Sequence, residues 1–398
     1  LKVSIDKKHI FLMLFLLVLI LSMTTINSLL VIGLNPAYQR SIQLESLDNG
    51  AVNRGESVTL GIGGKGQNCA VAAKCLTDMD IKLAQFVGSG FEGDALIDLI
   101  EKTQISTITK RINGPCRCAI TLVDKSRDME ATEIVEPSSR VNNNDIDAML
   151  QEIKLFSKSN TENNYNKNSI IAFMGSAPPG CESDLYGKIV KASMPKKIVV
   201  DTLFGLDAIF GNAKDIAASV LLKVNGREIC KLANTPLEEM GSENFIETPL
   251  YAIKNSVKKL FLQYESLNFI LVTDSKFPTT VFDRDMFMSS VSSSHWRVTN
   301  ADLSSIGPVV SPIGAGDAFA AGVLVSWGSF SSITTKKIID KSESRNKMNQ
   351  NDDDNDILKA AMMGAAAGAA SCLFPGCSKF DFKTFEQVYN GITVTKQE

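Results

Sequence analysis

The sequence predicts an α/β fold, with a three-layer α/β/α core around a mostly parallel sheet and a small β flap beside it. Apolar runs of strand length recur without polar alternation, and a helical pattern follows each of them. Such strands are typical of a parallel sheet that helices cover on both faces. The 398 residues, 44% hydrophobic and 21% charged, contain no visible repeat, so we expect one large domain with a flap.

The first 28 residues are predicted to be a signal or targeting segment that precedes the folded domain. Lys7 and Lys8 stand before an apolar run of twelve residues, Ile10 to Leu21, and small polar residues follow. This order is typical of a secretory-type signal, which would lead to the endoplasmic reticulum, the secretory pathway or an organelle reached through it. A membrane span needs about 20 apolar residues, so no stable span is expected after removal of the leader. A signal anchor is the alternative, because further apolar residues begin at Leu29.

Residues 29–398 are predicted to form the domain, as strands that alternate with helices. The strand LLVIGLN comes before the helix GQNCAVAAKCL, and the strand KLAQFVG before the helix GDALIDLIEK. Four later strands, each with a helical stretch after it, are SIIAFMG, KIVVD, SVLLKVN and FILVTD. Short alternating strands at about residues 39–60 and 116–136 predict a small antiparallel flap, or lid.

Two polar segments interrupt this pattern, at about residues 157–168 and 341–356. Both are rich in asparagine and poor in apolar residues. Such stretches cannot bury enough apolar surface to offset the entropy of ordering. We therefore predict two disordered surface insertions and assign them no function.

The composition excludes several function classes. A formal net charge of −3 provides no basic surface for nucleic acid. The two histidines, His9 and His295, are too few for a multi-histidine metal site, and a serine or cysteine triad is nearly excluded. The eight cysteines contain no C-x-x-C pair, and a chain of this size needs no disulfide framework. We expect mostly buried free thiols.

The stretch SPIGAGDAFAAG places Gly314, Ala315 and Gly316 at the start of an apolar helix, with Asp317 directly after them. The first backbone amides of a helix lack partners, and the N-terminal end of the helix dipole is positive. Small residues let an anion approach these amides. The stretch therefore indicates an oxyanion or phosphate site, with Asp317 as a general base or metal ligand. An ordinary glycine-rich turn is the alternative, and this stretch alone supports both equally.

The stretch GIGGKG, from Gly61 to Gly66, fits the pattern G-x-G-x-x-G of dinucleotide-binding proteins. It follows the predicted flap rather than a strand of a βαβ unit, which argues against a dinucleotide site. It is not a Walker A loop either, because Gly66 stands where Ser or Thr should follow Lys65. What remains is a glycine-rich turn into a helix, whose Lys65 and Asn68 are suited to holding hydroxyls or a phosphate. A plain tight turn is the alternative.

Two further turns follow predicted strands. KVNGREI carries Asn225 and Glu228, which could reach one magnesium–water shell or phosphate group. MGSAPPG carries Gly175 and Ser176. Open α/β sheets bind ligands at the carboxyl ends of their strands, where both turns lie. Each motif alone is more often an ordinary turn, but four motifs in this order indicate a common site.

Together these motifs resemble those of the PfkB, or ribokinase-like, carbohydrate kinases. GGKGQNCAVAAKCL is similar to the family's first signature, SPIGAGDAFAAG to its second, GSAPPG to its S-G-S-x-P-P-G turn, and VNGRE to its N-x-x-E motif. The resemblance covers the chain from about Leu29 to the C-terminus and implies a ribokinase-like fold. GLNPAYQ followed by GAVNRG looks most like the branch that phosphorylates sugar phosphates, the 1-phosphofructokinase and tagatose-6-phosphate kinase group.

The resemblance implies a role for each motif in a kinase that uses ATP and Mg²⁺. Asp317 matches the catalytic base, and the backbone of Gly314, Ala315 and Gly316 matches the anion hole. The nucleotide side of the site matches Gly314, Gly316, Asn225 and Glu228, of which Glu228 would hold Mg²⁺ through water. The substrate side matches residues of the first signature, the flap and a strand end, namely Gln39, Gly63, Gly64, Lys65, Asn68, Arg117 and Ser176. Lys65 and Arg117 would bind the phosphate of a sugar phosphate, because arginine suits bidentate contacts with oxyanions.

Three departures from the family pattern bear on the substrates. Gln39 stands where the branch usually has an aspartate, Pro312 and Ile313 replace a pair of threonines, and LVTDSKFPTT lacks the glycines that often lie beside the nucleotide. A neutral Gln39 suits an anionic substrate, since it removes a like charge and keeps hydroxyl contacts. The sequence therefore predicts an ATP- and Mg²⁺-dependent kinase of a sugar or sugar phosphate.

Two alternatives stay open. One is a kinase of an unphosphorylated sugar or nucleoside. The other is a catalytically silent relative that acts as a binding or regulatory protein, and the intact Asp317 with its two glycines argues against it. No nucleic-acid partner is expected. The residues do not decide the oligomeric state, and a homodimer is left open.

Overall fold

The protein is described by a computed structural model that covers residues 28–127, 129–162, 169–236, 247–289, 294–328 and 356–397. The predicted signal segment lies outside these residues except for Ser28, and the predicted insertion at 341–356 lies outside them except for Asp356. Within the described ranges, none of the helices has the length and apolar character needed to cross a membrane.

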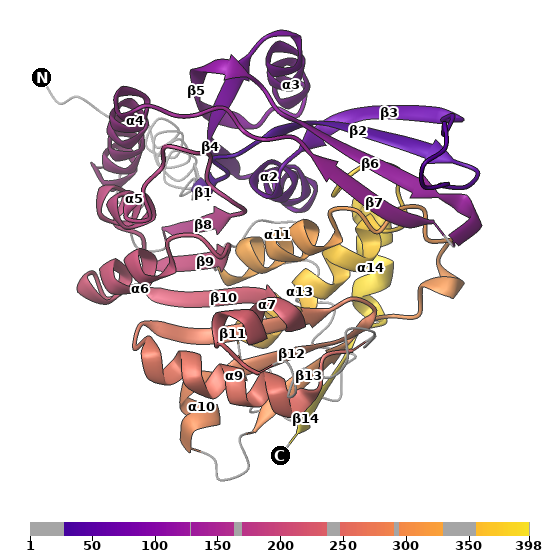
Figure 1. The fold of residues 1–398 in the computed structure, drawn as a ribbon. Coiled ribbons are helices and arrows are strands. Elements are labelled where there is room, and N and C mark those ends of the chain that lie inside the picture. Colours follow the sequence, from indigo (N-terminus) through magenta and orange to yellow (C-terminus); the bar gives the residue numbers. More distant parts are fainter. Residues whose placement is uncertain are drawn as a thin grey trace, which may run out of the picture.

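A ten-stranded sheet forms the core, in the order β14-β13-β12-β11-β10-β9-β8-β1-β4-β5 (Figure 1). Neighbouring strands from β11 to β5 pair in parallel, whereas β12, β13 and β14 add an antiparallel edge. The predicted α/β class with a mostly parallel sheet is confirmed. The strands are β1 Ser28–Ile32, β4 Asp80–Ser89, β5 Ser106–Pro115, β8 Ile170–Met174, β9 Lys197–Asp201, β10 Ser219–Asn225, β11 Leu267–Asp274, β12 Phe277–Asp283, β13 His295–Thr299 and β14 Thr393–Gln397.

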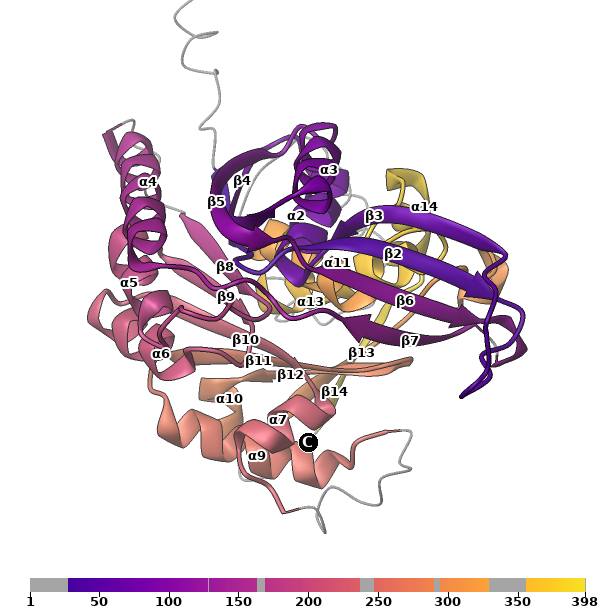
Figure 2. The ribbon, with the colours of Figure 1, turned by 45° about the horizontal axis from the view of Figure 1, so that its top comes forward.

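Helices cover both faces of this sheet, as Figures 1 and 2 show. Because side chains alternate along a strand, Leu29 and Val31 of β1 belong to one hydrophobic core and Leu30 and Ile32 to the other. The first core includes α2 Lys65–Leu76, α3 Phe91–Glu101, α11 Ala315–Trp327, α13 Asp356–Ser371 and α14 Phe382–Asn390. The second includes α4 Asn143–Glu162, α5 Leu185–Ser193, α6 Leu206–Asp215, α7 Gly226–Leu232, α9 Leu250–Gln263 and α10 Arg284–Ser289. All eight cysteines are free thiols, each buried or half-buried.

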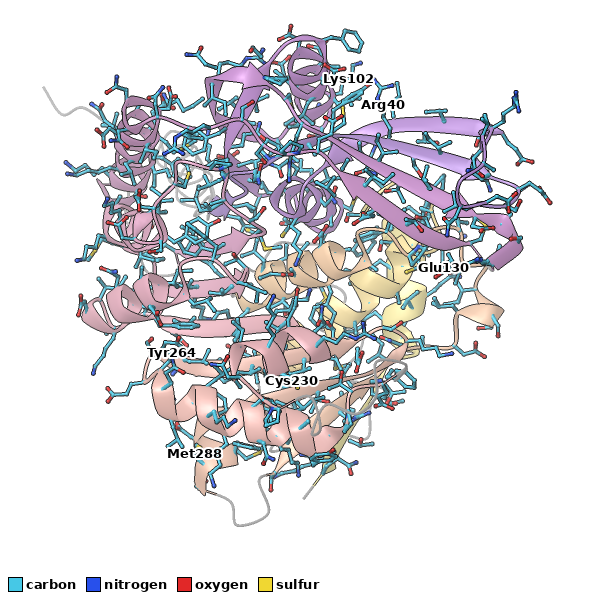
Figure 3. All side chains as sticks on the ribbon, viewed as in Figure 1. Arg40, Lys102, Glu130, Cys230, Tyr264 and Met288 are labelled. Carbon is cyan, nitrogen blue, oxygen red and sulfur yellow. The ribbon has the colours of Figure 1, made fainter. Side chains whose placement is uncertain are left out.

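A second sheet, in the order β3-β2-β6-β7, projects from the core as a lid (Figure 2). Its strands are β2 Ala37–Leu44, β3 Ser57–Gly63, β6 Cys118–Asp124 and β7 Glu130–Val135. The sequence predicts an antiparallel lid, but the central strands β2 and β6 pair in parallel. This part of the prediction is wrong because the chain enters the lid twice, after β1 and after β5, and these two strands run in the same direction. Arg40, labelled in Figure 3, lies at the base of the lid, where its Nη2 is 3.8 Å from Oε1 of Glu92 in α3.

Helix α4 corrects a second prediction. A disordered insertion is expected from residue 157, but α4 continues through Glu162. Ile146, Met149 and Ile153 of this helix are buried in the core. Once a helix has been nucleated, each added residue forms one more backbone hydrogen bond. The polar residues that follow the packed part of α4 therefore continue the helix. Residues 163–168 lie outside the described ranges.

The strand order reverses at β1, and this positions the predicted motifs. After β1 the chain builds β4 and β5 on one side, and then β8 to β11 on the other. In open α/β sheets such a switch point leaves a crevice at the carboxyl ends of the strands, where ligands bind. Asn35, Ser176, Asp201 and Asn225 all follow or end strands at this edge.

Candidate active site

The start of α11 lies at the centre of the candidate site. Gly314 is the N-cap residue, with a left-handed φ of 79°, and no side chain caps the helix. Its carbonyl accepts hydrogen bonds from the amides of Asp317 and Ala318, at 3.0 and 2.9 Å. A Cβ at Gly314 would lie 2.5 Å from the hydroxyl oxygen of Ser378, so only glycine fits. An uncapped helix start with small residues is a suitable place for an anion.

Asp317 is a buried carboxylate in the first turn of this helix. Asn68 of α2 donates a hydrogen bond from Nδ2 to Asp317 Oδ2 at 2.9 Å. Burial, together with the negative charge of Asp201, raises the pKa of Asp317 to about 6, although the hydrogen bond from Asn68 and the charges of Lys65 and Lys223 oppose the shift. A carboxylate with a pKa near neutrality is suited to accept a proton from a hydroxyl.

Two lysines converge on Asp201, which is fully buried at the end of β9. Lys65 Nζ lies 2.9 Å from Asp201 Oδ1, and Lys223 Nζ lies 2.7 Å from Oδ2. Burial alone would raise the pKa of Asp201, but the charges and hydrogen bonds of Lys223 and Lys65 outweigh it and lower the pKa. Lys223 Nζ also lies 3.2 Å from the position that a Cβ would take on Gly316. The charged group of Lys223 therefore lies close to the helix start.

Asp201 and Lys223 are functional candidates that the motif analysis misses. Asp201 ends the apolar strand KIVVD, and Lys223 interrupts the apolar run SVLLKVN. A charged residue inside a buried strand needs a partner, because an unpaired charge is costly to bury. This signal could have indicated Lys223, but nothing local to the sequence identifies Asp201 as its partner.

Asn225 and Glu228 form a capping box at the start of α7. The amide of Glu228 donates to Asn225 Oδ1 at 2.8 Å, and the amide of Asn225 donates to Glu228 Oε2 at 2.9 Å. The other carboxylate oxygen, Oε1, lies 3.7 Å from Lys65 Nζ. The described ranges contain no group of three or more His, Cys, Asp or Glu side chains that could hold a metal. A single carboxylate fits Mg²⁺, which usually keeps several waters and takes further oxygens from substrate phosphates.

A cavity of about 520 Å³, the switch-point cavity, opens at the carboxyl ends of β1, β8 and β9. Of the predicted residues it brings together Lys65, Arg117, Ser176 and Glu228. The guanidinium of Arg117 donates to the carbonyl oxygens of Asn35 and Pro36, at 2.6 and 3.1 Å. Asn35 Nδ2 in turn donates to the Ser176 hydroxyl at 3.0 Å. The cavity is therefore lined by fixed polar groups that suit hydroxyls or an anion.

Four predicted substrate residues do not line this cavity. Gln39 is buried in the lid, and its Nε2 donates to the Thr121 hydroxyl at 2.7 Å. Gly63 and Gly64 form the turn into α2, where Gly64 has φ +107°. Asn68 reaches Asp317 instead. Direct contact of these four residues with a substrate stays a prediction. Gly66 and Gln67 of the same signature, which the sequence analysis does not name as site residues, do line the cavity.

A second cavity of about 540 Å³, the α11–α13 cavity, includes Ala315 and Gly316 of the helix start in its lining. Small and apolar residues of the two helices form one wall, namely Ala315, Gly316, Phe319, Ala365, Gly368 and Ala369. Polar residues after β11 and β13 face them, namely Ser275, Lys276 and Asn300. Asp317 follows Ala315 and Gly316 of this cavity directly and is bonded to α2, whose first residues line the switch-point cavity. Asp317 is therefore linked to both cavities through its neighbours, although it is not among the residues that line either one.

Comparison with known proteins identifies the family of this arrangement. Residues 27–381 match the family model described as pfkB family carbohydrate kinase. The chain is similar to phosphofructokinase-2 from Escherichia coli in complex with fructose-6-phosphate, with 16% identity, a TM-score of 0.63, and coverage of 91% of this chain and 97% of that one. It is also similar to ribokinase from Giardia lamblia, with 15% identity, a TM-score of 0.65, and coverage of 91% and 99%. A protein described as a possible 1-phosphofructokinase from Thermotoga maritima has 18% identity, a TM-score of 0.61, and coverage of 94% and 100%. At these identities the solved structures establish a shared ribokinase-like fold.

Proposed function

The chain belongs to the pfkB family of carbohydrate kinases, and from that premise we propose that it transfers the terminal phosphoryl group of ATP to a hydroxyl of a sugar or sugar phosphate. One observation carries the proposal. A buried carboxylate, Asp317, stands directly after an uncapped, glycine-lined helix start, next to residues that line one cavity and hydrogen-bonded to the helix whose first residues line the other. Phosphoryl transfer needs the two substrates in line and the charge of the transferred group neutralised, and this arrangement supports both.

In the proposed reaction Asp317 takes the proton of the acceptor hydroxyl while the oxygen of that hydroxyl bonds to the terminal phosphorus of ATP. The bond between that phosphorus and the bridging oxygen breaks, and ADP leaves. The backbone of Gly314, Ala315 and Gly316 faces the transferred group, and Lys223 Nζ is close to Gly316. Amides and a lysine fixed in a buried site stabilise the developing charge without reorganising.

Glu228 is the residue that we propose holds Mg²⁺, through water, beside the phosphates of the nucleotide. Asn225 orients Glu228 through the capping box, and Oε1 of Glu228 faces the site. When bound, the ion supplies charge neutralisation for the phosphate oxygens. The α11–α13 cavity has the small apolar walls that suit a planar base, and it reaches the helix start through Ala315 and Gly316.

We propose an acceptor that already carries a phosphate, bound in the switch-point cavity by Arg117 and Lys65 with help from Ser176. Arg117 is half-buried, and no carboxylate pairs with it in the described part of the chain. Burial lowers its pKa, as expected for a charge that is partly desolvated. A desolvated guanidinium without a counter-ion favours an anionic ligand. A neutral sugar or a nucleoside is the alternative acceptor.

An ATP-consumption screen over sugars and sugar phosphates tests the proposal. Fructose 1-phosphate, fructose 6-phosphate and tagatose 6-phosphate are compared with fructose, ribose and adenosine. We expect the highest kcat/KM for one of the phosphorylated sugars. Preference for a neutral compound would support the alternative acceptor, and a folded chain that consumes ATP with none of the compounds would support a silent binding protein.

We also propose that the residues before Ser28 act as a leader and take no part in catalysis. The apolar run Ile10 to Leu21 lacks the polar alternation of a surface element. A chain that begins at Ser28, the first residue of β1, is expected to be soluble and to match the kcat of the full chain. Insolubility or loss of activity would show that the segment belongs to the fold.

A further inference from the structure

Lys276 is the one charged residue among those that line the α11–α13 cavity in the described part of the chain. It stands in the two-residue turn between β11 and β12, where Asp274 pairs with Phe277. Ser275, the other turn residue, has a left-handed φ of 52°. This tight turn holds the backbone of Lys276 at the rim of the cavity, and the turn belongs to the segment in which the sequence departs from the family's glycine pattern.

The neighbouring carboxylate of Asp274 is engaged elsewhere. Asp274 Oδ2 accepts a hydrogen bond from the amide of Thr248 at 2.6 Å. Lys276 is exposed, and it forms no ion pair with any residue in the described ranges. Its charge is therefore available for a ligand in the cavity.

The turn also lines the same cavity as the helix start, so one ligand could contact both. In the sheet register Asn225 at the end of β10 lies opposite Thr273 of β11, three residues before Lys276. Gly316 of the helix start lies close to Lys223, also on β10. Gly316 and Lys276 line the same cavity. A chain of phosphates that begins at Gly316 and crosses the ends of β10 and β11 would reach Lys276.

The other lysines of the site are already balanced by carboxylates. Lys65 and Lys223 share Asp201, and Lys65 also faces Glu228. Asp317 adds a further negative charge when it is ionised. A further cation would raise the affinity of this region for a nucleoside polyphosphate, because opposite charges attract each other more strongly in a partly buried site than in water.

We propose that Lys276 binds the phosphates of the nucleotide that are not transferred, and so makes the affinity of the α11–α13 cavity depend on the number of phosphates. This inference rests on the proposed function, because it takes the ligand of the cavity to be a nucleotide. Lys276 is a binding residue and does not touch the reacting hydroxyl. Its contribution is expected in nucleotide affinity and absent from the affinity for the sugar substrate.

The test measures the binding of adenosine, AMP, ADP and ATP to the full chain by titration calorimetry, for the wild type and Lys276→Met. We expect ATP and ADP to bind the variant about tenfold more weakly, as for a charge-assisted hydrogen bond, and adenosine to bind equally well. Lys276→Arg should restore most of the affinity. Lys102→Met is the matched control, because Lys102 is an exposed lysine at the end of α3 (Figure 3), away from both cavities.

Steady-state kinetics separate this inference from the proposed function. The expected result is a raised KM for ATP in Lys276→Met, with kcat at saturating ATP and KM for the sugar unchanged. The role of Lys276 is overturned if the wild type and Lys276→Met bind ATP equally well, or if the variant loses as much affinity for adenosine as for ATP. In either case, phosphorylation of a sugar by the wild type would still support the kinase function. A folded wild type that binds no adenine nucleotide overturns both.

Discussion

The two cavities of the candidate site differ in how they are built. The switch-point cavity is formed at strand ends and by the first residues of α2, and its Lys65 is paired with the carboxylates of Asp201 and Glu228. The α11–α13 cavity has alanine and glycine of two helices on one wall, and Lys276 is the one charged residue among the described residues that line it. The switch-point cavity is suited to binding hydroxyls and charged groups through hydrogen bonds. The α11–α13 cavity is suited to a flat apolar group that fits its shape.

This difference indicates which substitutions should change kcat and which should change the affinity for ATP. A hydrogen-bonded site loses transition-state stabilisation when one group moves, because the partners are left unpaired. A cavity with small apolar walls mainly loses volume when a side chain is enlarged. Changes on the switch-point side should therefore act on kcat and on the choice of acceptor, and changes on the α11–α13 side on the KM for ATP.

The largest expected effect comes from Asp317, which follows residues that line the α11–α13 cavity and is hydrogen-bonded to α2 beside the switch-point cavity. Asp317→Asn keeps the shape of the side chain and removes its ability to take a proton, so kcat should fall by about 10²–10⁴-fold. Binding of ATP, measured by calorimetry, should stay within about twofold of the wild type, since the nucleotide cavity is unchanged. A variant that keeps most of the wild-type kcat would exclude Asp317 as the base.

The same variant should be more stable than the wild type at neutral pH. Folding raises the pKa of Asp317 from its ordinary value of 3.8 to about 6, so the folded state disfavours the ionised form. The wild type therefore loses stability as the pH rises from about 4 to 6, whereas the asparagine side chain of the variant cannot ionise. The gain should be about 2–3 kcal/mol in the free energy of unfolding above pH 7 and should vanish below pH 4. Urea unfolding at several pH values checks this, and a gain that does not change with pH would contradict it.

A smaller effect tests the charge of the switch-point cavity. Arg117→Ala should lower kcat/KM for a phosphorylated sugar by about 10- to 100-fold, as expected for lost charge-assisted hydrogen bonds, and should leave the value for the unphosphorylated sugar almost unchanged. Arg40→Ala is the matched control, because Arg40 lies at the base of the lid beside Glu92 and does not line the cavity (Figure 3). Equal losses for both acceptors, or equal losses in both variants, would show that Arg117 supports the lid and not a phosphate.

The smallest effect is expected from narrowing the α11–α13 cavity. Ala369 is half-buried and lines the cavity, so Ala369→Leu should fill part of the space for the base. The KM for ATP should rise by about five- to tenfold, which corresponds to the lower end of overpacking costs. The KM for the sugar substrate should not change. A change in sugar selectivity instead would mean that the roles of the two cavities are reversed.

Features that depend on neighbouring residues could be recognised in the sequence. The apolar strands identify the α/β class because burial on both faces of a parallel sheet demands uninterrupted apolar runs. The helix start at Gly314 to Asp317 is contiguous, so its turn, its amides and its carboxylate can be read together. Lys223 leaves a weaker signal, as a charge within a buried strand.

Contacts between distant residues were decided by the tertiary structure. Asn68 and Asp317 are 249 residues apart, and Lys65 and Asp201 are 136 apart, yet each pair is hydrogen-bonded. The order of the strands and the docking of α2 against α11 bring these pairs together, and both depend on how the whole sheet packs. The parallel pairing of β2 with β6 arises in the same way, from the common direction of β1 and β5. A local pattern can therefore specify an element and its buried face, but the partners across a sheet follow from the global arrangement that buries the most apolar surface.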